Sequence, residues 1–428
     1  MKEKFKLTSL EKSWILYDIG NSAFILLVST LLPIYFNALA SGAGISESDY
    51  LAYWGYAGSV ATILVAIIGP ICGTMADWNY KKPLFLGSLA LGAIGCAALG
   101  VAWGWLSFLV IFIIARVGYN CANVFYDSML PEITTEERMD NVSTMGYALG
   151  YIGSVIPFAL CLVLVLLHDT FGMSQVTALI ISFIITAVWW VVCSVPLAKR
   201  YKQTAFHENG GKPVGDSFKQ LARTFKEAKK HKHIFVYLIA FFFFIDGVYT
   251  IIDMATAYGT ALGLDTTGLL LALLVTQIVA FPFAILFGRL ASKYDTGLLI
   301  KICILAYTAI AAFAIFLATQ WQFWTLAVLV GMFQGGIQAL SRSYLAKIIP
   351  AEQSGEYYGL MDICGKGASF LGTTLVAVVS QLTAGTTLKV FGMELQNESI
   401  AVGTLVVLFA IGFVLFCKAD KLNKARAQ

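Results

Sequence analysis

Ionisable and amide side chains recur at helical spacing inside apolar stretches of this sequence. Arg116, Asn120, Asn123 and Asp127 follow one another at intervals of four, three and four residues, which places them on one face of a helix. A charged side chain in hydrocarbon costs several kcal/mol, so such a face is expected to line a cavity or to meet a partner. The chemistry available there is recognition of a polar solute and exchange of a proton.

Polar faces of the same kind occur in three more apolar stretches. The four faces recur at every third predicted helix, a period that a central polar cavity lined by equivalent helices would produce. Arg116 and Asp246 lie roughly 15 to 18 Å from a helix end, near the middle of a membrane. The three further faces consist of Asp18, Asn21 and Ser22; of Asp246, Tyr249, Thr250 and Asp253; and of Gln334, Gln338, Ser341 and Arg342.

The two deepest charges suggest specific roles. We expect Arg116 to hold a carboxylate through paired hydrogen bonds, and Asp246 to hold an ammonium group or a coupling proton. The alternative is that both side chains pair with other residues and only fix the packing of helices. The residues that we expect to bind solute or to couple transport are Asp18, Asn21, Arg116, Asn120, Asn123, Asp246, Tyr249, Gln334 and Gln338.

The elements that carry these side chains are predicted to be membrane-spanning helices, which makes the chain an all-α membrane protein. Of its 428 residues, 58% are hydrophobic and 13% are charged, whereas soluble domains carry about 25% charged residues. This composition excludes a soluble enzyme, a secreted disulfide scaffold and a nucleic-acid reader. Runs long enough to span, which takes roughly 20 residues, occur at about 13–40, 50–76, 84–103, 106–130, 141–167, 175–197, 234–258, 267–290, 297–319, 322–345, 356–383 and 399–417.

Lysine and arginine indicate the orientation of these twelve runs. Of the 29 Lys and Arg residues, the predicted outer loops contain only Lys389, and Arg116 and Lys366 lie within predicted helices. The others lie on or at the edge of the opposite side, so we expect both termini in the cytoplasm and the protein in the plasma membrane. A cleaved signal peptide is the alternative, but the apolar stretch from Trp14 is too long for one and carries Asp18.

The predicted helices form two sets of six. Residues 1–197 are expected to form one bundle and residues 234–428 the other, joined by a basic cytoplasmic linker at 198–233 in which an amphipathic helix can lie on anionic lipid. Prolines and glycines recur in register, as Pro131 and Pro350 do after the fourth helix of each set. Duplicated bundles place one site between two halves in alternating-access transporters. Chance is the alternative, because glycine and proline are common in such helices.

Four segments carry a resemblance to known transporters. The loop GTMADWNYKKP (Gly73 to Pro83) resembles the loop between helices 2 and 3 of the major facilitator superfamily, although Trp78 and Tyr80 depart from its usual basic residue and glycine. The other three resemble its vacuole effluxer-like family, with Gly20 in place of a usual alanine. They are WILYDIGNSAF (14–24), FFIDGVYT (243–250) and QGGIQALSRS (334–343).

This resemblance implies the major facilitator fold and a gate on the inner side. Asp127 would be available to pair with Lys81 or Lys82, and Ser292 replaces the aspartate of the second copy, so that gate would be weaker. The association of fungal members with amino-acid release suggests amino acids as the solute. The residues assigned to gating are Gly73, Asp77, Lys81, Lys82, Asp127 and Arg342.

These observations together predict a secondary active transporter that moves a small solute by alternating access, coupled to protons and functional as a monomer. Its other expected partner is membrane lipid, and no nucleic acid is expected. No phosphate-binding GxxxxGK[ST] loop occurs, and no nucleophile or metal-ligand constellation, so we expect no enzyme, no cofactor and no metal site. The alternatives are an uncoupled facilitator or channel, and a receptor or scaffold that kept the fold without transport.

Overall fold

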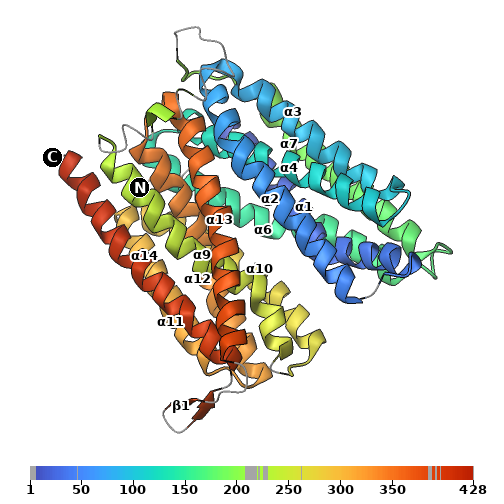
Figure 1. The fold of residues 1–428 in the computed structure, drawn as a ribbon. Helices are drawn as coiled ribbons and strands as arrows, with labels where there is room; N and C mark the ends of the chain where they lie inside the picture. Colours follow the sequence, from blue (N-terminus) through green and yellow to red (C-terminus); the bar gives the residue numbers. More distant parts are fainter. Residues whose placement is uncertain are drawn as a thin grey trace. The chain divides into compact units, whose positions relative to one another are not determined.

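The computed structural model consists almost entirely of helices (Figure 1). Among the described residues the exception is an antiparallel hairpin of β1 (Leu388–Val390) and β2 (Met393–Leu395), which the sequence analysis did not predict. The structure describes residues 6–45, 47–207, 219, 222–224, 230–261, 263–383, 388–390, 393–395 and 397–427. The predicted amphipathic helix of the linker falls mostly outside these residues.

The chain divides into two compact units. The first contains Met1–Thr135, Leu149–Leu221 and Pro350–Gly359, and the second contains Glu136–Ala148, Ala222–Ile349 and Leu360–Gln428. Two helices, α6 and α13, therefore begin in one unit and continue in the other. The helices up to the linker are α1 (Ser9–Gly42), α2 (Glu47–Met75), η1 (Ala76–Tyr80), α3 (Lys81–Ala98), η2 (Leu99–Val101), α4 (Trp105–Ser128), α5 (Leu130–Ile133), α6 (Glu136–Leu166) and α7 (Gln175–Arg200).

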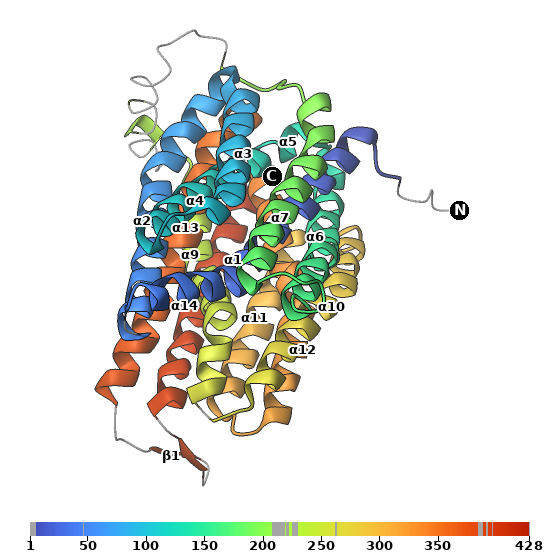
Figure 2. The ribbon, with the colours of Figure 1, turned by 90° about the vertical axis from the view of Figure 1, so that its right-hand side faces the viewer.

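The helices after the linker pair in the same way as those before it. In the first unit α1 packs on α7, α2 and α3 pack on α4, and α3 packs on α7; in the second, α9 packs on α14, α10 and α11 pack on α12, and α11 packs on α14 (Figure 2). These matched pairings agree with the predicted internal repeat. The later helices are α9 (Lys232–Ala261), α10 (Thr266–Ala291), α11 (Thr296–Ile315), α12 (Gln320–Ile348), η3 (Ala351–Gln353), α13 (Ser354–Leu382) and α14 (Asn397–Ala427).

Ten segments of the described residues are helices long and apolar enough to cross a membrane. One of them, Tyr53–Val101, contains most of α2 and all of α3, and α13 contributes a shorter apolar stretch, Leu371–Leu382, among the described residues. Each predicted apolar run lies on a helix, while the number of spans stays a prediction. The chain is a multi-pass membrane protein.

The helices begin where capping side chains stand. Thr8 Oγ1 accepts from the backbone N–H of Glu11, whose carboxylate accepts from the backbone N–H of Thr8, a reciprocal pair that starts α1. Asp265 and Asp295 accept backbone N–H groups at the starts of α10 and α11. Such caps satisfy donors that have no partner within the helix.

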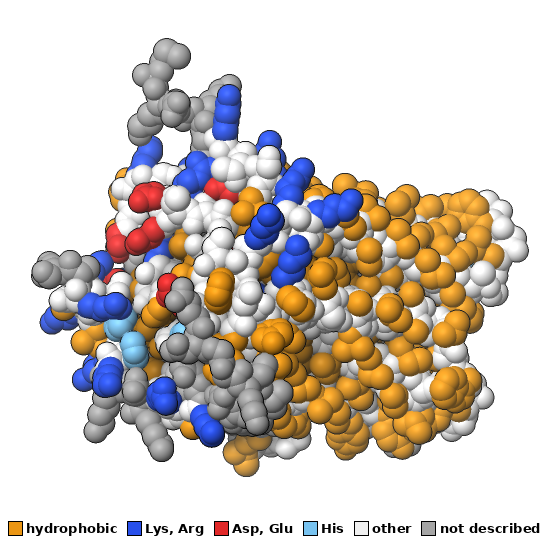
Figure 3. Space-filling model, turned by 90° about the horizontal axis from the view of Figure 1, so that it is seen from above, with side chains coloured by type: hydrophobic (Ala, Val, Ile, Leu, Met, Phe, Trp, Pro, Cys, Tyr) orange, Lys and Arg blue, Asp and Glu red, His pale blue; other side chains and the backbone are white. Residues whose placement is uncertain are grey.

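The interior of each unit is aromatic, and much of the outer surface is apolar. Trp14 stacks on Tyr126 with ring centroids 4.4 Å apart, which fixes α1 on α4. Figure 3 shows lysine and arginine side chains gathered on one part of a face whose remainder is mostly hydrophobic. Outward side chains such as Ile94 and Leu166 are 69% and 70% exposed, as expected for helices surrounded by lipid rather than water.

Candidate functional site

The N-terminus of α13 is held by a carboxylate from a distant part of the first unit. Asp77 in η1 is 1% exposed, and its two oxygens accept the backbone N–H groups of Gly355 at 2.7 Å and of Glu356 at 2.8 Å. The first N–H groups of a helix lack partners within it, and a carboxylate there also interacts favourably with the helix dipole. Asp77 therefore caps α13 in place of a local residue.

Glycines let the backbones of α2 and α13 touch next to this cap. A Cβ built on Gly73 would overlap the carbonyl oxygen of Gly355, and one built on Gly359 would lie 2.9 Å from the Cα of Pro70. Small residues spaced by four allow helices to approach this closely. Gly73, which was predicted as a gating residue, lies at this contact.

The backbone that aims Asp77 at α13 makes an irregular turn. The segment η1 is one turn of π-helix, in which Trp78 and Asn79 leave the helical conformation, and Asn79 has φ of 68°. Asparagine is among the few non-glycine residues that tolerate this region. Asn79 thus supplies the bend that turns the chain from α2 into α3.

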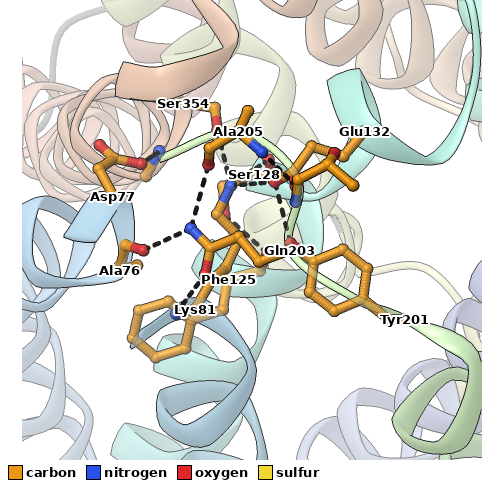
Figure 4. Close-up of polar contacts among 12 residues, drawn as sticks. Ala76, Asp77, Lys81, Phe125, Ser128, Glu132, Tyr201, Gln203, Ala205 and Ser354 are labelled. Carbon is orange, nitrogen blue, oxygen red and sulfur yellow. Dashed lines mark hydrogen bonds and ion pairs between the residues drawn. The ribbon is translucent and has the colours of Figure 1, made fainter. Parts of the chain in front are cut away.

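A buried lysine ties the same end of α13 to α4 and α5. Lys81 Nζ is fully buried and donates to the carbonyl oxygen of Ser128 at 3.2 Å, to Glu132 Oε1 at 2.6 Å and to Ser354 Oγ at 2.9 Å (Figure 4). An ammonium group has three donors, and these three acceptors satisfy all of them. We call Asp77, Lys81, Glu132 and Ser354 the α13 clamp.

The carboxylate that pairs with Lys81 in this clamp, Glu132, was not predicted as a site residue. Glu132 follows α4 on the short helix α5, whereas the predicted partner, Asp127, is half-buried in the last turn of α4. Lys82 Nζ donates to the backbone carbonyl of Tyr201 at 3.0 Å. Burial and the neighbouring carboxylate of Glu132 raise the pKa of Tyr201, so its hydroxyl stays protonated and donates to Glu132 Oε1 at 2.9 Å.

The second unit holds the N-terminal end of α6 through a different carboxylate. Asp140 is 4% exposed, and its Oδ2 accepts from Lys347 Nζ at 2.5 Å and from Thr296 Oγ1 at 2.7 Å, while its Oδ1 accepts from Ser343 Oγ at 2.6 Å. Neither Asp140 nor Lys347 was predicted as a site residue. Both lie near helix ends, where many residues are polar and hydrophobic periodicity does not single out a functional side chain.

At the place where the resemblance predicts a weakened gate, the contact is between neutral groups. Ser292, which follows α10, accepts a hydrogen bond at 2.9 Å from Asn141 Nδ2 on α6. The carboxylate near this contact is Asp140 of α6, which pairs with Lys347. We call Asp140, Asn141, Ser292, Thr296 and Lys347 the α6 clamp.

Lys347→Met is expected to destabilise the protein more than Lys424→Met. Lys347 and its partner Asp140 are 19% and 5% exposed, so the change leaves a buried carboxylate short of a donor, at about 2–4 kcal/mol. Lys424 is 52% exposed and pairs with the exposed Asp295 and with the buried Asp420. Asp420 keeps Lys301 as a donor, so the loss of Lys424 should cost about 0–1 kcal/mol. Melting of the purified variants in one detergent measures the difference. Equal shifts in melting temperature would contradict it.

Arg342, predicted as a gating residue, is buried within the second unit against α6. Its Nε donates to Ser143 Oγ and its Nη2 to the carbonyl oxygen of Ser143, both at 2.9 Å, and its guanidinium lies 4.4 Å from the ring centre of Tyr147. Three contacts on one stretch of α6 place Arg342 one turn from the α6 clamp.

In the first unit the predicted polar faces of α1 and α4 meet. Asn123 Oδ1 accepts from Asn21 Nδ2 at 2.8 Å and from the Tyr17 hydroxyl at 3.2 Å. Asp18 and Asn120 are also buried. Arg116 is half-buried with its guanidinium 5.8 Å from the ring centre of Phe112, and the described contacts do not place it against Asn21 or Asn123.

In the second unit one carboxylate oxygen of Asp246 accepts hydrogen bonds and the other has no donor among the described residues. Asp246 is fully buried on α9, and its Oδ1 accepts the backbone N–H of Gly372 at 2.9 Å and the Thr250 hydroxyl at 3.4 Å. Its Oδ2 is buried and has no hydrogen-bond partner among the described residues. Burying a carboxylate oxygen without a hydrogen-bond donor costs free energy of folding, and the role of Asp246 in coupling stays a prediction.

The remaining predicted binding residues lie on α12 and α9. Gln334 is 6% exposed on α12, Gln338 is half-buried one turn further on, and Tyr249 is half-buried on α9. Their binding roles stay predictions. Over the residues that the structure describes, no group of His, Cys, Asp or Glu could hold a metal ion.

Comparison with known proteins identifies relatives of this chain along its length. A model of the family described as "Vacuole effluxer Atg22 like" matches residues 9–428. An uncharacterized MFS-type transporter of Bacillus subtilis, YxiO, is 39% identical over 416 residues, which are 96% of this chain and 94% of that protein. Autophagy-related protein 22-1 of Penicillium rubens is 25% identical over 267 residues, which are 56% of this chain and 44% of the fungal protein.

Solved structures share the fold at low sequence identity. The transporter FucP in its outward conformation matches with a TM-score of 0.69 and 16% identity, over 96% of this chain and 97% of FucP. A bacterial homologue of the iron transporter ferroportin matches with a TM-score of 0.69 and 13% identity, over 96% and 98% of the two chains. Since the family model spans nearly the whole chain and the Bacillus relative aligns along it, the chain belongs to the vacuole effluxer Atg22-like family of the major facilitator superfamily, whose members are transporters and not enzymes.

Proposed function

We propose that this transporter is a proton-coupled secondary carrier that moves a small solute across the plasma membrane by alternating access. The observation that supports this most directly is Asp246, a fully buried carboxylate in an apolar helix with one oxygen lacking a donor among the described residues. Such a group can take up and release a proton without breaking its bond to Gly372. A scaffold would have little reason to retain the cost of this charge.

Twelve spans with both termini in the cytoplasm belong to the same proposal. They follow from the twelve apolar runs and from the near absence of Lys and Arg in the predicted outer loops. With this orientation the α13 clamp and the α6 clamp lie at the cytoplasmic ends of helices, where an alternating-access carrier opens and closes its inner entrance. Matching helix pairings in the two units support a working monomer that contains both halves.

Amino acids are the solute class that we propose. The family description names a vacuole effluxer, and Arg116 offers a guanidinium that can bind a carboxylate through two hydrogen bonds. Asn21 and Asn123 provide amide groups in the same unit. These groups suit a small zwitterion better than a lipid or an uncharged sugar.

Transport assays test this function. Cells with and without the protein are compared for released and retained metabolites, and purified protein in liposomes is then given radiolabelled amino acids under an imposed pH gradient. Accumulation that follows the gradient supports proton coupling. Equilibration without accumulation indicates a facilitator or channel instead, and no movement of any metabolite in either assay supports a scaffold.

Arg116→Gln is expected to weaken binding of a carboxylate-bearing solute about tenfold or more, because hydrogen bonds to a charged group contribute about 1.5–3 kcal/mol. The measurement is the solute concentration for half-maximal exchange in liposomes, for the amino acid found above. Arg289→Gln, at an exposed arginine near the end of α10, is the matched control. Unaltered affinity in a normally folded Arg116 variant overturns the assignment.

A further inference from the structure

The seven residues that follow α7 lie against the α13 clamp. Residues 201–207, which we call the strap, are neither helix nor strand, yet Tyr201 is 1% exposed. The strap begins the segment that leads from the first set of six helices to the second. Its contacts therefore connect that segment with the clamp (Figure 4).

Gln203 of the strap bonds both ends of the irregular turn η1. Its Oε1 accepts the backbone N–H of Lys81 at 3.0 Å, and its Nε2 donates to the carbonyl oxygen of Ala76 at 2.8 Å. One amide side chain thus spans the turn that carries Asp77. A turn with Asn79 at positive φ needs such outside support to persist.

Glu132 joins the strap to the lysine of the clamp. Its Oε1 accepts from Lys81 Nζ and the Tyr201 hydroxyl, and its Oε2 accepts the backbone N–H groups of Thr204 at 2.6 Å and Ala205 at 3.1 Å. The Glu132 side chain is only 1% exposed. Since these acceptors are charged and buried, each bond is stronger than one between neutral groups at the surface.

The strap also reaches the backbone of Asp77 itself. The N–H of His207 donates to the carbonyl oxygen of Asp77 at 2.9 Å. The strap therefore bonds the backbone of both residues whose side chains hold α13. Asp77 accepts the amides of Gly355 and Glu356, and Lys81 donates to Ser354 Oγ.

We propose that the strap is a lock on the α13 clamp, with Gln203 and Glu132 as positioning residues. The bonded strap holds η1 and Lys81 in the arrangement that caps α13, and displacement of the strap frees Asp77 and Lys81 to release it. The start of the linker thereby controls a gate rather than only joining two halves. This inference rests on the proposed alternating-access function.

Hydrogen exchange of the full-length protein in lipid nanodiscs tests the lock. The amides of Gly355 and Glu356 are the reporters, because Asp77 is their acceptor and the first turn of α13 offers no other. In Gln203→Ala, a change at a half-buried residue that touches neither reporter, exchange of these amides is expected to be about tenfold faster. Glu132→Gln is expected to have the same effect through Lys81.

A buried carboxylate at another helix start in the same unit provides the control. Glu11 is 1% exposed and accepts from Thr134 Oγ1 at 2.6 Å and from the N–H of Thr8 at 2.7 Å, without a described bond to the strap or clamp. Glu11→Gln should leave exchange at Gly355 and Glu356 as in the native protein. Similar melting temperatures for Gln203→Ala and Glu11→Gln separate a lost lock from general unfolding.

The outcomes distinguish the lock from the function on which it rests. If Gln203→Ala speeds exchange at Thr204, Ala205 and His207 but not at Gly355 and Glu356, the strap only packs against the unit and the lock is wrong. Should Glu132→Gln fail to fold, Gln203→Ala still decides the question. If even Asp77→Asn leaves the reporter amides unchanged, the clamp does not hold α13 and the lock is wrong. Failure of the proposed function shows separately, as no movement of solute by the native protein in liposomes.

Discussion

Asp77→Asn is expected to slow net transport at least about tenfold while leaving solute affinity near that of the native protein. The carboxylate of Asp77 accepts two backbone N–H groups from the start of α13, at 2.7 and 2.8 Å. An asparagine accepts through one oxygen only and turns an NH₂ group toward the second N–H. Loss of charge-assisted bonds worth about 1.5–3 kcal/mol each shifts the balance between bonded and released α13 by an order of magnitude or more.

Two measurements separate switching from binding in this variant. The solute concentration for half-maximal exchange reports affinity, and the rate of gradient-driven uptake reports how often the carrier completes its cycle. Hydrogen exchange at Gly355 and Glu356 reports the release of α13 directly. We expect faster exchange at these amides, slower uptake and unchanged affinity.

Asp265→Asn is the matched control. Asp265 is exposed and caps its own helix, α10, by accepting the N–H of Gly268 at 2.7 Å. The same chemical change therefore occurs at a carboxylate whose described hydrogen bond is to its own helix, although the backbone N–H of Asp265 donates to Gln320 Oε1. A local cap of this kind costs about 1 kcal/mol at most positions. If Asp77→Asn lowers affinity and leaves the uptake rate intact, Asp77 belongs to the binding site rather than to a gate.

The helices of this protein were largely predictable because lipid imposes a simple rule on sequence. Each spanning helix needs a long apolar run, and every predicted run lies on a helix, as 13–40 lies within α1 (Ser9–Gly42). Polar residues stand out against such runs. For that reason Asn21, Asn123 and Asp246 could be selected, and Asn21 and Asn123 from two of the predicted polar faces contact each other.

The two clamps were less predictable because they form at helix ends, where polar residues no longer stand out against an apolar run. Glu132, Asp140 and Lys347 stand at helix ends among other polar residues, so neither periodicity nor hydropathy singles them out. The partners of Asp77 are backbone amides, which carry no sequence signal at all. Pro131 directly before Glu132 marked a turn after α4, and that was the available hint that a carboxylate there faces Lys81.

Resemblance to the superfamily located Gly73, Asp77 and Lys81 but did not give their geometry. It predicted a weak second gate because Ser292 replaces an aspartate. In the second unit Ser292 bonds Asn141 and the backbone of Gly288, both neutral groups, while Asp140 of α6 accepts from Lys347. The carboxylate in this clamp comes from α6, a helix in which the resemblance marked no gating residue.

Asp246→Asn is expected to abolish accumulation of solute while leaving exchange intact. With one proton moved per solute, a pH gradient of one unit can sustain up to about a tenfold concentration ratio, since one unit corresponds to about 1.36 kcal/mol. Asparagine has nearly the shape of aspartate and still accepts the N–H of Gly372, but it carries no exchangeable acidic proton. The variant should stop at equal concentrations on the two sides.

Stability should change in the opposite direction from activity. Asp246 is fully buried, with one oxygen that has no donor among the described residues, so the charged form is poorly solvated. Removing that charge while keeping the bond to Gly372 should leave the melting temperature equal or higher. A loss of accumulation therefore cannot be ascribed to unfolding in this variant.

Asp253→Asn on the same helix is the control for charge alone. Asp253 lies two turns further along α9 and is exposed, whereas Asp246 is fully buried, so the change should leave accumulation as in the native protein. The assay is uptake of the identified amino acid into liposomes, with and without a pH gradient, beside solute exchange at equal pH. Gradient-driven accumulation that persists in Asp246→Asn assigns the coupling proton to another group, whereas loss of exchange as well as accumulation assigns Asp246 to solute binding.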